Sequence, residues 1–151
     1  MWPSSNGGRI PPVKAESRGA KRPLALRLVF LGWLLGILFP LAALGRSWPA
    51  FRARFDAVFS PFWVHVAMHA GLYAVLALLA ALLFPFPRSW KGFFTLAGLL
   101  LAVGMAQEAL QAAGNGFFYL PGAAFDLGVD LAGGALGWLL AALAQRRREK
   151  A

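Results

Sequence analysis

The chain of 151 residues contains no cysteine and few charges, since only 14% of its residues are Asp, Glu, Lys or Arg. The absence of cysteine excludes disulfides, thiolate nucleophiles and cysteine-bound zinc or iron–sulfur centres. Soluble domains carry about one charged residue in four. The low charge and the 59% of hydrophobic residues therefore indicate a membrane protein.

Four long apolar stretches follow the first 22 residues. Each has close to the roughly 20 residues that a helix needs to cross a bilayer, and each is too long for a strand. The first is longer than the apolar region of a signal peptide, and no cleavage pattern follows it, so we expect it to be retained. We predict an all-α integral membrane four-helix bundle over residues 23–145. The expected spans are residues 24–44, 62–84, 92–113 and 123–144.

The positive charges predict the orientation of these spans. Residues 1–22 have the composition of a disordered basic tail, and residues 146–151 form a second basic tail. Four spans put both tails and the turn at residues 85–91 on one side, together with twelve of the fifteen Lys and Arg residues. The positive-inside rule then makes both termini cytoplasmic. Because basic tails beside spans contact anionic headgroups, we expect membrane lipids as partners, and no nucleic acid.

Five ionisable side chains interrupt the apolar stretches. Burying such groups in a bilayer costs several kcal/mol each unless they pair or face water. In the predicted topology two lie at the start of the second span, one near the end of the third and two at the start of the fourth. We therefore expect one polar site near the outer membrane face. The five residues are His65, His69, Glu108, Asp126 and Asp130.

Helical spacing places these polar residues on shared faces. His65, His69 and Tyr73 are four residues apart, and Glu108 and Gln111 are three apart. Residues three or four apart are neighbours on a helix surface. Each set can therefore face the bundle, with Tyr73 and Gln111 orienting the ionisable groups by hydrogen bonds. Taken alone, His65 also fits a residue that simply contacts interfacial water.

The fourth span combines polar and small residues on one face. Asp126 and Asp130 are four apart, and Gly133 and Gly137 continue the same face. Small residues at this spacing allow close helix packing in membranes. Taken alone, Asp126 also fits a cap that accepts hydrogen bonds from the first amides of the helix.

The order of these residues resembles the VanZ-like family of small bacterial integral membrane proteins. The similar segments are "HVAMHAGLYAVLALL", "EALQ" and "PGAAFDLGVDLAGGALG", which lie within about residues 60–140. The family pattern has a His and a Tyr in one span, Glu-x-x-Gln in a later span, and then a Pro-Gly turn before an Asp. The matching residues here are His69, Tyr73, Glu108, Gln111, Pro121 and Gly122.

The sequence departs from the family pattern at several positions. His65 stands where the family has Asp, Val66 where it has Lys, and Ala123 where it has Arg. Without the Lys and Arg, an anion-binding role that those residues suggest for the family does not carry over.

The family aspartate can be aligned in two registers. With Asp126 as that aspartate, Asp130 takes the place of the family Asn and Gly133 matches the family Gly. With Asp130, Gly134 replaces the Asn and Gly137 matches.

The resemblance implies a protein of the bacterial cytoplasmic (inner) membrane with a cell-envelope accessory function. The founding member of the family is associated with resistance to the glycopeptide antibiotic teicoplanin, but no general reaction follows for the family. We expect a site that binds a lipid headgroup, a lipid-linked precursor or a glycopeptide, without catalysis and without a cofactor.

Three alternatives stay open. A metal-assisted enzyme acting on an envelope lipid could use the His pair and the carboxylates as zinc or manganese ligands, although H-E-x-x-H is absent. A proton- or ion-coupled carrier could use the same groups as a relay. A membrane scaffold would use them only to fix helix packing. The sequence leaves the oligomeric state open, including a homo-oligomer.

Overall fold

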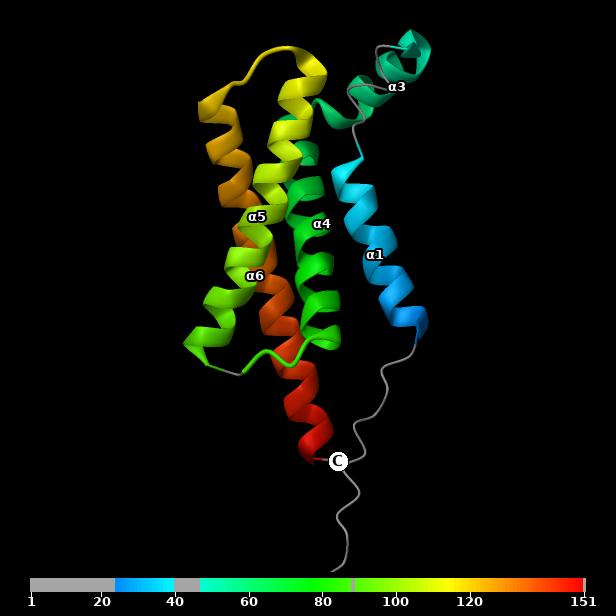
Figure 1. The fold of residues 1–151 in the computed structure, drawn as a ribbon. Helices are drawn as coiled ribbons and strands as arrows, with labels where there is room; N and C mark the ends of the chain where they lie inside the picture. Colours follow the sequence, from blue (N-terminus) through cyan, green and yellow to red (C-terminus); the bar gives the residue numbers. More distant parts are fainter. Residues whose placement is uncertain (1–23, 40–46, 88, 151) are drawn as a thin grey trace, which may run out of the picture.

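The computed structural model of the chain describes residues 24–39, 47–87 and 89–150. These residues form five helices and no strand (Figure 1), which confirms the predicted all-α fold. The predicted N-terminal tail, residues 1–22, lies outside the described residues. The helices are α1 (Leu24–Leu38), α3 (Pro49–Phe59), α4 (Phe62–Leu83), α5 (Trp90–Asn115) and α6 (Leu120–Lys150).

Three of these helices are long and apolar enough to cross a membrane: α4, α5 and the part of α6 from Leu120 to Arg147. They correspond to the second, third and fourth expected spans, of which the second extends one residue beyond α4. Helix α1 has 15 residues, which cover about 22 Å at 1.5 Å per residue, less than the roughly 30 Å of a hydrocarbon core. The last part of the expected first span, residues 40–44, lies outside the described residues.

Large apolar side chains cover the outside of the helices. Leu28, Leu35, Phe94, Leu136 and Leu139 are all at least half exposed. Contiguous apolar surface of this kind is rare on soluble monomers, and lipid chains would cover it in a bilayer. The outer surface therefore agrees with a multi-pass membrane protein.

The core lies where α4, α5 and α6 meet, and α1 packs along its side (Figure 1). Tyr73, Leu76 and Ala77 of α4 are fully buried there against Leu96 and Leu100 of α5. The indole Nε1 of Trp33 in α1 donates a hydrogen bond to the carbonyl oxygen of Leu72 at 2.9 Å. This bond and the apolar contacts attach α1 to α4.

Helices α4 and α6 make the most extensive helix contact. They run in the same direction, because α5 returns the chain between them (Figure 1). A Cβ on Gly133 would overlap the carbonyl oxygen of Ala70, and one on Gly137 would overlap that of Ala74. The two glycines therefore allow the backbones of α4 and α6 to approach, as the small-residue spacing predicts.

The connection between α5 and α6 is short. Gly116 ends α5 with φ 78°, and its N–H bonds the carbonyl oxygen of Ala112 at 2.8 Å. This left-handed conformation suits glycine. Helix α6 begins at Leu120 with Pro121 in its first turn, where a missing N–H costs no helix bond. The tight turn places the end of α5 beside the start of α6.

Candidate functional site

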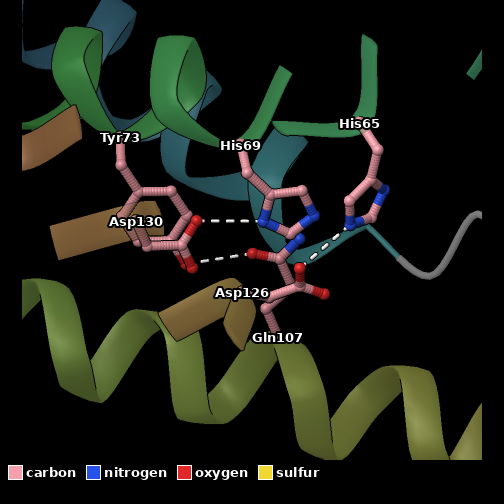
Figure 2. A network of polar contacts seen from close by, with 6 residues as sticks. All are labelled: His65, His69, Tyr73, Gln107, Asp126 and Asp130. Carbon is pink, nitrogen blue, oxygen red and sulfur yellow. Dashed lines mark hydrogen bonds and ion pairs between the residues drawn. The ribbon is translucent and has the colours of Figure 1, made fainter. Parts of the chain in front are cut away.

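Two histidine–aspartate pairs connect α4 to α6 (Figure 2). Nε2 of His65 lies 3.0 Å from Oδ1 of Asp126, and Nδ1 of His69 lies 2.9 Å from Oδ1 of Asp130. Because both helices run in the same direction and both pairs use a spacing of four, the pairs form two successive rungs. Both aspartates therefore face α4, and Asp126 is not a helix cap, since α6 begins six residues earlier at Leu120.

The two rungs differ in their access to solvent. The side chains of His69 and Asp130 are 2% and 4% exposed, whereas those of His65 and Asp126 are 37% and 15% exposed. The imidazoles stack obliquely, with ring centroids 4.5 Å apart. The inner pair is thus buried within the α4–α6 contact, and the outer pair lies beside it (Figure 2), one turn closer to the starts of both helices.

The hydrogen bonds orient the imidazole rings. When the aspartates are ionised they only accept hydrogen bonds, and the contacting nitrogen of each ring then carries the proton toward the carboxylate. A neutral His69 then keeps a lone pair on Nε2, and a neutral His65 keeps one on Nδ1. Such a nitrogen can bind a metal ion or accept a proton from a ligand.

Tyr73 extends the inner rung toward α5. Its fully buried hydroxyl donates a hydrogen bond to Oε1 of Gln107 at 2.9 Å (Figure 2). Gly104 makes this approach of α5 possible, because a Cβ there would lie 2.6 Å from Cδ2 of Leu127 and 3.3 Å from both Oδ2 of Asp130 and the Tyr73 hydroxyl. Three helices thus contribute to one polar cluster.

The structure places the two predicted α5 residues at the edge of this cluster. Glu108 is half-buried, and its carboxyl group makes no hydrogen bond with any residue that the structure describes. Gln111 lines a neighbouring cavity. Gln107, which the spacing argument did not select, is the α5 residue that bonds Tyr73. Its spacing of four from Gln111 is the sequence signal that could have identified it.

A cavity of about 440 Å³ adjoins the two histidines. Its walls combine polar groups of α4 and α5 with the aromatic face of α3 and the end of α1. Asp126 and Asp130 are not among the lining residues, so the two imidazoles, and not the carboxylates that they contact, form this part of the wall. The polar lining residues include Arg52, Asp56, His65, His69, Gln107 and Gln111, and the aromatic ones are Phe39, Phe51, Phe55 and Phe59.

One group of side chains has a geometry suited to a metal ion. His65, His69 and Asp126 each offer a ligand atom, and these three atoms lie within 4.8 Å of one another. Asp130 contacts the other nitrogen of His69 from behind.

Comparison of the chain with family models, with curated proteins and with solved structures gives no significant match.

Proposed function

We propose that this chain is a VanZ-like integral membrane protein with an accessory function in the bacterial cell envelope. It binds the polar part of an envelope lipid, a lipid-linked precursor or a glycopeptide in the cavity beside His65 and His69. The observation that carries the proposal is this cavity of about 440 Å³, whose wall joins polar groups of two membrane helices to an aromatic helix. A link to teicoplanin-type resistance rests on the resemblance to the family.

The lining of the cavity suits an amphiphilic ligand. Hydrogen-bonding groups from Gln107, Gln111 and the histidines face one part of it, and phenyl rings of α3 face another. Binding sites of this size usually combine a largely apolar wall with a few polar groups that fix orientation. A polar headgroup would therefore occupy the histidine side, and its apolar portion would contact α3.

The proposed topology puts this cavity at the outer face of the cytoplasmic membrane. The expected first span, of which α1 is the described part, is the first of four membrane crossings, and both termini are cytoplasmic by the distribution of Lys and Arg. The start of α1 and the end of α6 lie at the same end of the bundle, opposite α3 and the start of α4 (Figure 1), which supports this arrangement. The first two turns of α4 contain His65 and His69.

A coupled carrier is less well supported. Next to the inner rung, Gly133 and Gly137 of α6 pack against Ala70 and Ala74 of α4, and none of these four residues is ionisable. A relay needs polar groups along the whole path.

Binding to the purified protein tests the proposal. The full chain is placed in nanodiscs of phosphatidylethanolamine and phosphatidylglycerol and titrated separately with a polyprenyl phosphate and with teicoplanin. We expect saturable binding of one of them, weakened about tenfold or more in Gln111→Ala, because that side chain lines the cavity. Met105→Ala, on the exposed face of α5, is the matched control. Binding of neither probe, or equal binding by both variants, would contradict the proposal.

A further inference from the structure

We propose that His65, His69 and Asp126 bind a divalent transition-metal ion, best matched by Zn²⁺, and that Asp130 positions His69 for it. This goes beyond the proposed function, because it concerns a bound ion and holds whether or not an envelope ligand enters the cavity.

The ligand geometry is the first support. One atom from each of the three residues lies within 4.8 Å of the others, and His65 and Asp126 are already 3.0 Å apart. Zinc binds imidazole nitrogen at about 2.0–2.1 Å and carboxylate oxygen at about 2.0–2.2 Å, so the ligand atoms of one ion lie at most about 4.2 Å apart. The three side chains would have to draw slightly closer together to hold the ion. The ion would replace the proton that now joins His65 to Asp126.

The buried aspartate behind His69 is the second support. Histidines that bind metals almost always donate their other ring N–H to a carboxylate or a carbonyl, which fixes the ring and makes it a better ligand. Asp130 makes this contact at 2.9 Å to Nδ1 of His69, with both side chains almost fully buried. Nε2 of His69 then faces away from Asp130, on the side of Asp126 and His65 (Figure 2).

The donor types select the class of ion. Two imidazoles and one carboxylate are the three protein ligands of many zinc sites that leave a fourth position open. Calcium and magnesium prefer oxygen ligands alone. Because both imidazoles line the cavity, the fourth ligand is a water or a group of a molecule bound there.

The chain suits a direct test, because these two are its only histidines and it has no cysteine. The full chain, purified in detergent with a tag free of histidine, is stripped with a chelator and titrated with Zn²⁺ against a competing chelator. X-ray absorption then counts the imidazoles on the loaded zinc. We expect about one Zn²⁺ per chain and two imidazoles. Failure to bind stoichiometric zinc, or binding of zinc by fewer than two imidazoles, would overturn the proposal. This test uses the wild-type chain alone.

Variants separate the roles of the residues. His65→Gln, at a partly exposed side chain, should abolish stoichiometric binding while the helical circular dichroism and the elution volume stay unchanged. Asp130→Asn should weaken the affinity by about 10–100-fold but keep two imidazoles on the zinc. Met105→Ala, at an exposed side chain of α5, is the matched control that should bind zinc normally. Unchanged affinity in His65→Gln would also overturn the proposal.

Discussion

The two halves of the α4–α6 contact use the same geometry for opposite purposes. In one half, residues at a spacing of four are His and Asp, and they meet through short polar contacts. In the other half the same spacing carries Gly133 and Gly137 against the backbone of Ala70 and Ala74. The apolar half sets how closely the helices approach, and the polar half depends on that distance. A helix pair can therefore hold ionisable groups in a membrane when the neighbouring helical turns carry residues small enough for close packing.

The largest expected effect comes from substitutions that add bulk to the apolar half of the α4–α6 contact. Gly133→Leu or Gly137→Leu would drive a side chain into the carbonyl groups of α4, and backbone atoms cannot move aside as a side chain can. The cost should exceed the roughly 3 kcal/mol of ordinary overpacking. We expect little monodisperse protein after detergent extraction, measured by size-exclusion chromatography.

Gly128→Leu is the matched control in the same helix, because nothing lies within 4 Å of a Cβ at Gly128. Its yield should equal that of the wild type. A similar loss of monodisperse protein in all three variants would show that α6 tolerates no added bulk at any of these positions. It would contradict the conclusion that Gly133 and Gly137 set the approach of the two helices.

The next largest effect is expected in the inner rung. His69→Ala leaves the carboxyl group of Asp130 buried without its partner, and breaking one side of a buried pair costs about 3–5 kcal/mol. Replacing both residues by Leu removes the unpaired group and should cost less than His69→Ala. The measurement is the free energy of unfolding in mixed micelles titrated with SDS. A double variant less stable than the single one would contradict this account.

A smaller effect is expected where α5 joins the polar half. Tyr73→Phe removes the hydrogen bond to Gln107 and should lower the free energy of unfolding by about 0.5–1.5 kcal/mol. Tyr119→Phe, at a side chain that is 64% exposed, is the control and should change nothing. Equal values for the two variants in the same SDS titration would mean that the bond to Gln107 does not stabilise the fold.

The smallest effect is expected in the outer rung. Because His65 is 37% exposed, water can take the place of its side chain, and solvent-accessible ion pairs contribute about 0–1 kcal/mol. His65→Ala should therefore lower the free energy of unfolding by less than His69→Ala in the same assay. The reverse order would refute the assignment of inner and outer rungs.

The all-α fold and the three long apolar helices could be predicted from the sequence. Apolar runs of about 20 residues identify α4, α5 and α6, and the burial cost of ionisable groups draws attention to His65, His69, Asp126 and Asp130. The pairing of each histidine with one aspartate could not be predicted, because a spacing of four fits either aspartate. That register depends on the contact of Gly133 with Ala70, which is a property of two helices together.

The rotation of α5 and the ends of the helices were harder to predict from the sequence. The rotation of α5 decides whether Gln107 or Glu108 meets Tyr73, and the close contact at Gly104 sets that rotation. The sequence predicts a loop for the uncharged segment around Pro121. In the structure Pro121 lies in the first turn of α6, where proline is tolerated. The expected spans consequently fell short of the ends of α5 and α6.

The length of α6 links the two ends of the molecule mechanically. Its 31 residues form one uninterrupted rod of about 46 Å, with Asp126 and Asp130 near one end and Arg146 and Arg147 near the other. A stiff helix transmits axial displacement along its whole length. If α6 moves along its axis as one rigid body, the aspartates and the arginines move by the same distance, which ties the position of this basic end to that of the polar cluster.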